Sequence, residues 1–222
     1  MYDELAEYYD LIYADWEASM GRHGAFIAHF LPEVARVLDV SAGIGTQSLP
    51  LAAQGYSVTA RDLSRTAIRR LGREADRRGV SIDAAASDMR HVGRTVHPPF
   101  DAIVCFDNSL PHLLTDAEIV STLVGFREVL APSGILLVSI RDYGTVDRGG
   151  RAIHRYGERS RKGRRYRVTQ EWEPAWTLES STSRSSFSPS CWRGRSRSVS
   201  GCRARPGNDG GDPRHLTVRV VV

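Results

Sequence analysis

Hydrophobic and polar positions follow two different periods along the first 140 residues. Short apolar runs, which are typical of buried strands, lie at residues 37–40, 56–60, 80–85, 101–106 and 135–140. Between them, apolar positions recur at helical spacing over residues 46–54, 64–79 and 115–130. Strands that alternate with helices of this length predict an α/β fold: a doubly wound, mainly parallel sheet with helices on both faces.

Local signals indicate where several of these elements begin and end. Ser64 and Thr115 are suitable N-caps for the second and third helices, because their hydroxyls can accept from free backbone N–H groups. Gly55 and Gly79 suit the C-terminal ends of the first two helices. The Pro-Ser-Gly segment at residues 132–134 is expected to end the third helix before the last strand.

The N-terminal region is predicted to be helical over residues 2–31, with a second helical run starting near Gly24. It lacks the basic and apolar pattern of a secretory signal, and the chain contains no apolar run of about 18 residues. Cys105, Cys191 and Cys202 are an odd number without metal-ligand spacing. We therefore expect free thiols, no metal site, no membrane association and a cytoplasmic location.

The charge is divided between the two parts of the chain. Residues 1–140 hold 12 Arg against 18 Asp and Glu, a net charge of −6, whereas residues 141–222 hold 18 Arg and Lys against 8 acidic residues, a net charge of +10. The regular alternation also stops after residue 147. Residues 166–172 fit one more strand, and residues 216–222 form a strand-like run without an obvious neighbour.

Candidate ligand-binding residues lie at the ends of four successive predicted strands. Parallel sheets bind ligands at this carboxyl edge, so the four groups are expected to converge on one pocket. Asp62 follows Asp39 by 23 residues, the spacing expected of a carboxylate that binds ribose hydroxyls. The four groups are Asp39, Ser41, Gly43 and Gly45; Asp62 and Leu63; Asp88 and Met89; and Asp107 and Asn108 after Phe106.

A dinucleotide-binding fold is the main alternative for such a turn. Its fingerprint needs a third glycine, and Ser48 occupies that position. Asp39, inside the strand before the turn, is also poorly suited to a pyrophosphate, because both are negatively charged. It suits a ligand that carries an ammonium group.

The segment Val37–Thr46 resembles the first motif of class I S-adenosylmethionine (SAM)-dependent methyltransferases, with Ser41 where that family usually has glycine. The resemblance implies a Rossmann-like core and SAM as cofactor. It places Gly43, Gly45, Ser41 and Asp39 at the methionine part of SAM and Asp62 at the ribose. It places four further residues around the adenine and the end of the fourth strand: Leu63, Asp88, Met89 and Phe106.

Three stretches over residues 35–145 are similar to glycine and sarcosine N-methyltransferases: the first motif through Asp62-Leu-Ser, then residues 107–113, and residues 140–143. The resemblance implies a small, carboxylate-bearing amine as acceptor. Arg141 would hold the carboxylate through two parallel hydrogen bonds, with Asn108 and Tyr143 beside it. Catalysis would depend on positioning and desolvation of a neutral amine. His112 is either a second polar contact or a helix-capping or core histidine.

The same resemblance suggests a division of the chain. Residues 1–34 would form a helical lid, with Tyr9, Tyr13 and Trp16 over the site; residues 35–147 the SAM-binding core; and residues 148–178 a partial substrate-side strand region. Residues 179–222 form a basic, Ser/Arg/Gly/Pro-rich tail, which is expected to be disordered. We interpret this tail as a frameshift product that replaces the family's last strands. The alternative is a basic arm that binds nucleic acid, or an inactive truncated enzyme.

Overall fold

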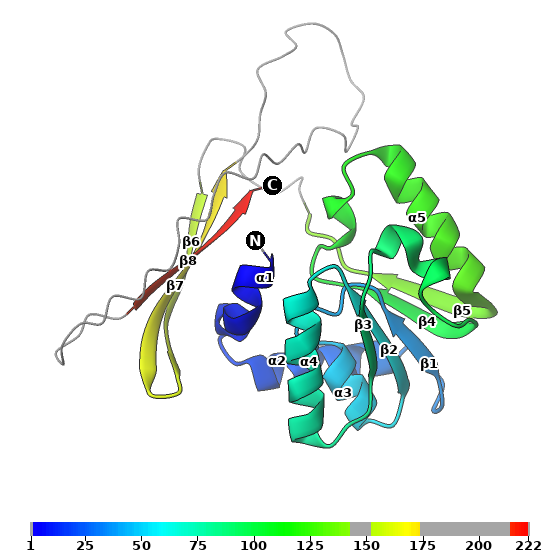
Figure 1. Ribbon diagram of the computed structural model, residues 1–222, viewed down its shortest axis with the longest axis horizontal. Helices are drawn as coiled ribbons and strands as arrows, with labels where there is room; N and C mark the ends of the chain where they lie inside the picture. The colour runs from blue at the N-terminus through cyan, green and yellow to red at the C-terminus, as the bar shows by residue number, and fades with distance from the viewer. Residues whose placement is uncertain (1, 143–151, 174–213, 222) are drawn as a thin grey trace, which may run out of the picture.

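The computed structural model describes residues 2–142, 152–173 and 214–221. Five parallel strands form a sheet of order β3-β2-β1-β4-β5, as the alternating pattern predicts (Figure 1). Its strands are β1 (Arg36–Asp39), β2 (Ser57–Asp62), β3 (Asp83–Ala86), β4 (Phe100–Cys105) and β5 (Leu130–Val138). The helical segments that accompany them are α3 (Ser48–Ala53), α4 (Arg65–Arg78), η2 (Met89–Arg94), η3 (Leu110–His112) and α5 (Asp116–Val129). The predicted Rossmann-like α/β fold is confirmed.

Alternate side chains of β1 build two separate cores, one on each face of the sheet. Leu38 and Val40 pack with Phe126 of α5 and Val92 of η2. Val37 packs on the opposite face with Leu51 of α3 and Ile27. Because β1 is buried on both faces, its adjacent residues Val37 and Leu38 are both apolar.

The predicted caps are present. Ser64 Oγ accepts from Ala67 N at 3.1 Å, and Thr115 Oγ1 accepts from Glu118 N at 3.1 Å. Gly79 ends α4 in the left-handed conformation, with φ of 64°. Two strand boundaries differ from the predictions. β3 begins at Asp83 and not at residue 80. β5 begins at Leu130, and its pairing with β4 is interrupted over residues 131–134, where the predicted Pro-Ser-Gly break lies.

The N-terminal region is helical, but its break lies elsewhere than expected. It consists of α1 (Tyr2–Leu5), the 3-10 helix η1 (Ala6–Ile12) and α2 (Trp16–Ala28). Asp15 caps α2 by accepting from Ala18 N at 2.9 Å. Gly24, predicted to start the second run, lies inside α2, where a Cβ would come within 2.7 Å of Pro50 Cβ. The glycine therefore allows α2 to approach α3 and does not mark a break.

A second sheet contains β6 (Ala152–Arg161), β7 (Arg164–Glu173) and β8 (Arg214–Val221), in that order. β6 and β7 form an antiparallel hairpin, and β8 pairs with β7 in parallel. The strand predicted at residues 166–172 is thus present, and the C-terminal apolar run has β7 as a neighbour. The low-complexity residues 180–205 lie outside the described residues, as do Cys191 and Cys202.

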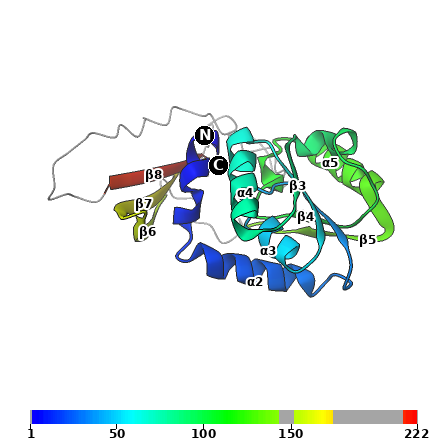
Figure 2. The same ribbon diagram turned by 60° about the horizontal axis from the view of Figure 1, so that its bottom comes forward.

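The N-terminal segment of residues 2–13 lies between this second sheet and α4 (Figures 1 and 2). Leu5 and Leu11 pack against Val168 of β7. No helix in the described part of the chain combines the length and the apolar character needed to cross a membrane.

Candidate functional site

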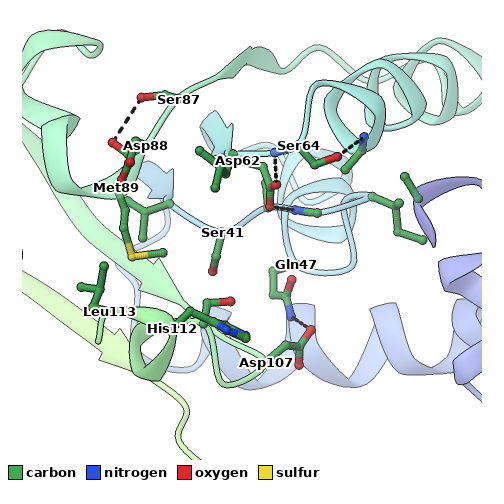
Figure 3. A pocket seen from close by; sticks show the side chains of 18 of the residues that line it. Ser41, Gln47, Asp62, Ser64, Ser87, Asp88, Met89, Asp107, His112 and Leu113 are labelled. Carbon is green, nitrogen blue, oxygen red and sulfur yellow. Dashed lines mark hydrogen bonds between the residues drawn. The ribbon is translucent and has the colours of Figure 1, made fainter. Parts of the chain in front are cut away.

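A cavity of about 400 Å3 lies at the carboxyl ends of β1, β2, β3 and β4. This volume is within the range of small-molecule sites. Six of the twelve predicted site residues line it: Ser41, Gly43, Asp62, Leu63, Asp88 and Met89. Figure 3 shows Ser41 in the middle of the site, with Asp62 and Ser64 on one side and Gln47 and Asp107 on another. The expected convergence of the strand ends is therefore observed.

The turn after β1 needs its glycines. Gly43 and Gly45 have φ of 52° and 98°, values that side-chain-bearing residues rarely adopt. A Cβ on Gly45 would also lie 2.7 Å from Leu49 Cγ. Gly45 therefore allows the turn to pack against Leu49, outside the cavity, whereas Gly43 forms part of the cavity wall.

Asp39 lies beneath this turn and is not part of the cavity wall. Its carboxylate accepts from Ser48 Oγ at 2.7 Å and from Ser41 N at 3.2 Å. Burial raises the pKa of Asp39 to about 7. Asp39, which the sequence suggested as the partner of an ammonium group, therefore accepts its hydrogen bonds from the protein itself.

Asp62 joins β2 to the same turn. Its Oδ2 accepts from Gly43 N and its Oδ1 from Ser64 N, both at 2.8 Å. Burial raises the pKa of Asp62, and the two backbone bonds oppose this shift. A carboxylate held in this way keeps lone pairs that can accept from the hydroxyls of a ribose.

Asp88, Met89, Leu63 and Leu113 border another part of the cavity. Arg90 holds Asp88 through an Nη2–Oδ2 ion pair of 2.6 Å and lowers the pKa of that carboxyl. The same arginine contacts Glu118 of α5 at 2.9 Å. Apolar side chains beside an ionised carboxylate suit a flat heterocycle with a polar edge.

The segment after β4 has a strained backbone. Asp107 and Asn108 both have positive φ, 55° and 63°. Ser139 holds this turn by accepting from Asp107 N at 2.8 Å, and Asn108 Oδ1 accepts from Arg141 N at 3.1 Å. Strained turns of this kind are concentrated at functional sites. Asn108, Arg141 and Phe106 are not in the cavity wall, and Tyr143 lies outside the described residues.

Gln47 and Asp107 form a hydrogen-bonded pair that no motif predicted as a site. Gln47 Nε2 donates to Asp107 Oδ2 at 3.1 Å and lies 3.0 Å from His23 Nδ1. Tyr13 Oη donates to the same Asp107 oxygen at 3.2 Å. The sequence placed Asp107 at a strand end, but it gave no signal that Gln47 and His23 would meet there.

Part of the predicted aromatic lid reaches the site. Tyr9 lines the cavity, as does His112, whose pKa is lowered by desolvation. Tyr13 and Trp16 do not line the cavity, but each donates a hydrogen bond to a residue that does. Tyr13 donates to Asp107, and Trp16 Nε1 donates to Thr46 Oγ1 at 2.9 Å. Among the described residues, no group of three or more His, Cys, Asp or Glu side chains is placed to hold a metal ion.

A comparison with known families identifies this arrangement. Residues 37–134, which contain the carboxyl ends of β1, β2, β3 and β4, match the family model described as a methyltransferase domain. This part of the chain is similar to methyltransferase domains. The predicted resemblance is confirmed, and SAM is the cofactor of enzymes in this SAM-dependent class.

Individual proteins similar to this chain include the glycine/sarcosine N-methyltransferase of Parasynechococcus marenigrum, 33% identical over 63% of this chain and 50% of that protein. The dTDP-3-amino-3,6-dideoxy-alpha-D-glucopyranose N,N-dimethyltransferase of Streptomyces fradiae is 28% identical over 74% of this chain and 68% of that protein. A SAM-dependent methyltransferase structure from Clostridium acetobutylicum has the same fold, with a TM-score of 0.56 at 18% identity over 70% of this chain and 64% of that one. The chain spans about half the length of the glycine/sarcosine enzymes it matches.

Proposed function

We propose that this protein transfers the methyl group of SAM to the amine of a small amino acid of the glycine or sarcosine type. The observation that carries the proposal is the single cavity built from four successive strand ends inside the methyltransferase domain. The names of the similar proteins support an amine acceptor, because both relatives described above are N-methyltransferases. The family match gives no support to a nucleic-acid-binding function for the basic segment.

The cavity residues suit the parts of SAM in a definite order. Asp62 would accept from both ribose hydroxyls, and the wall formed by Leu63, Met89 and Asp88 would bind the adenine. Gly43 would lie against the methionine part, where the absence of a side chain permits close approach. This order requires no movement of Asp62, which backbone groups already hold in place.

The acceptor would bind on the side of the segment after β4. SAM supplies a methyl group bonded to a positively charged sulfur. Arg141 would hold the carboxylate of the acceptor by a bidentate contact. Asn108, which accepts from Arg141 N, would act by fixing the backbone that carries this guanidinium. The protein would thus orient a neutral amine and exclude water, and it needs no general base for the transfer itself.

The proposal is tested by binding and by transfer. Isothermal titration with S-adenosylhomocysteine, the demethylated product, should show binding to the wild-type protein at one site per chain. Asp62→Ala should weaken this binding by about 10- to 100-fold, because a charge-assisted hydrogen bond contributes roughly 1.5–3 kcal/mol. Asp76→Ala, which removes an exposed carboxylate of α4, is the matched control and should bind normally.

Transfer of a radiolabelled methyl group then decides the acceptor. Glycine and sarcosine should be methylated, whereas an amino sugar without a carboxylate should not. Methylation of the amino sugar alone would contradict the amino-acid acceptor but would still support a methyltransferase activity. A protein that is folded by circular dichroism and binds neither SAM nor its product would refute the whole proposal.

A further inference from the structure

The structure leaves one part of SAM without the protein partner that the sequence suggested. SAM carries an α-ammonium group on its methionine part, and Asp39 was the expected partner. Asp39 is buried, however, and both of its oxygens accept hydrogen bonds from Ser48 and Ser41. Because Asp39 is buried and does not line the cavity, a ligand bound there does not contact its carboxylate.

Another carboxylate is on the cavity wall near the turn after β1. Asp107 lines the cavity together with Gln47, which belongs to the segment between β1 and α3. Figure 3 shows these two side chains away from Asp88 and Met89, with Ser41 between the two groups. If Asp88 and Met89 bind the adenine, the opposite end of SAM lies beside Asp107.

The hydrogen bonds of Asp107 leave one oxygen available. Tyr13 Oη and Gln47 Nε2 both donate to Oδ2, and no described residue donates to Oδ1. The pKa of Tyr13 is raised by burial and by the negative charge of Asp107, so Tyr13 remains a donor. Two neutral donors on one oxygen fix the carboxylate without neutralising its charge.

The backbone of Asp107 contributes to this orientation. Its φ of 55° lies in the left-handed region, which aspartate and asparagine tolerate better than most residues. Its N–H donates to Ser139 Oγ, so the residue is held by the segment that follows β5 as well as by Tyr13 and Gln47. Backbone strain together with three hydrogen bonds indicates a side chain placed for binding.

We infer that Asp107 binds the α-ammonium group of the methionine part of SAM through Oδ1. This inference rests on the proposed function and gives Asp107, which the sequence placed only at a strand end, a specific partner on the cofactor. Through Tyr13 and Gln47, the same carboxylate joins the N-terminal segment and the turn after β1 to the bound cofactor. Binding of the acceptor amine by Asp107 is the alternative outcome of the test below.

Three ligands separate the contribution of the ammonium group from that of the nucleoside. S-adenosylhomocysteine has both the ammonium and the carboxylate, decarboxylated SAM has the amine without the carboxylate, and 5′-methylthioadenosine has neither. Asp107→Asn removes the charge, keeps the shape and tolerates the left-handed backbone. Asp107→Asn should lower the affinity for S-adenosylhomocysteine and for decarboxylated SAM by about 10- to 100-fold. It should change the affinity for 5′-methylthioadenosine by less than about twofold.

Each other result overturns the inference in a recognisable way. An equal loss for all three ligands would show that Asp107 only supports the fold of the site. Unchanged S-adenosylhomocysteine affinity with a raised KM for glycine would assign Asp107 to the acceptor. Absence of S-adenosylhomocysteine binding to the wild-type protein would refute the proposed function together with this inference.

Two further variants keep the test informative. Asp76→Asn changes an exposed carboxylate on α4 and should leave all three affinities unaltered. Tyr13→Phe removes one donor to Oδ2 but leaves the charge of Asp107. It should lower the affinity for S-adenosylhomocysteine less than Asp107→Asn does, again with little effect on the affinity for 5′-methylthioadenosine. A greater effect of Tyr13→Phe on 5′-methylthioadenosine than on S-adenosylhomocysteine would contradict the assignment.

Discussion

At the scale of single residues, the three aspartates of the site have different surroundings. Asp39 is buried under the turn, Asp62 is held by two backbone N–H groups, and Asp107 is bound by two side-chain donors on one oxygen. The sequence predicted their approximate position, because each follows or ends a strand. It did not predict their different roles, since these depend on Ser48, Gln47 and Tyr13, which belong to other elements.

Asp39 predicts a pH dependence of stability. Its pKa in the folded protein is raised to about 7, above the ordinary value near 4 of the unfolded chain. The folded state therefore binds more protons than the unfolded state between these values, and stability falls as pH rises from about 4 to 8. Asp39→Asn removes this titration, and the Ser48 hydroxyl can turn to accept from the new amide.

The measurement is equilibrium denaturation of both proteins at several pH values. Relative to wild type, Asp39→Asn should gain about 2–4 kcal/mol of unfolding free energy between pH 4 and pH 8. A difference between the two proteins that does not change with pH would mean that Asp39 titrates normally in the folded state.

Arg141 has a distinct prediction, because its proposed role concerns only the acceptor. Arg141→Ala should raise the KM for glycine by an amount equivalent to about 2–4 kcal/mol while S-adenosylhomocysteine affinity stays the same. Arg141→Lys keeps the charge but loses the bidentate geometry, so it should restore only part of the loss. Steady-state kinetics with both variants test this role, and a parallel loss of cofactor affinity would contradict it.

At the scale of elements, α4 and the N-terminal segment are joined by a buried arginine. Arg70 Nη1 donates to Ala6 O at 2.6 Å, Nη2 lies 2.8 Å from Asp10 Oδ1, and the guanidinium is stacked 5.5 Å from the centroid of the Trp16 ring. Ala6 and Tyr9, on the same segment, form part of the cavity wall. The contact thus connects the packing of α4 to the shape of the site.

Arg70→Ala should lower the unfolding free energy by about 3–5 kcal/mol, because it leaves the Asp10 carboxylate and the Ala6 carbonyl without this partner. Arg69→Ala is the matched control on the same helix. Its side chain is exposed and donates to Thr66 Oγ1 of the same helix, so a change of less than about 0.5 kcal/mol is expected. Chemical denaturation of both variants gives the comparison, and similar losses would show that burial of Arg70 is unimportant.

The elements themselves were largely predictable from periodicity and caps. Ser64, Gly79 and Thr115 mark boundaries by local chemistry, and the structure places those boundaries where the residues indicate. Gly24 was misinterpreted because its purpose is close packing against Pro50, a tertiary contact. β6 lies within the partial strand region that the resemblance suggested, but periodicity did not indicate it, since a hairpin strand rich in charged residues has little apolar alternation.

At the scale of the whole molecule, folding and cofactor binding depend on the same strand ends. Because residues of β1, β2, β3 and β4 meet only in the folded chain, a cofactor product should bind the native state alone. S-adenosylhomocysteine at about 100 times its Kd should then raise the unfolding free energy by about 2.7 kcal/mol. Denaturation curves with and without ligand measure this, and Asp62→Ala should show a much smaller gain at the same concentration.

The N-terminal segment has a consequence for the rate of turnover. Residues 2–13 form part of the cavity wall while being attached to α4 by Arg70 and to the β6–β7 hairpin by Arg159, which donates to Tyr13 O at 3.1 Å. If a bound nucleoside leaves past this wall, some of these attachments must open. We therefore expect product residence time, and not the chemical step, to respond most to changes in the hairpin.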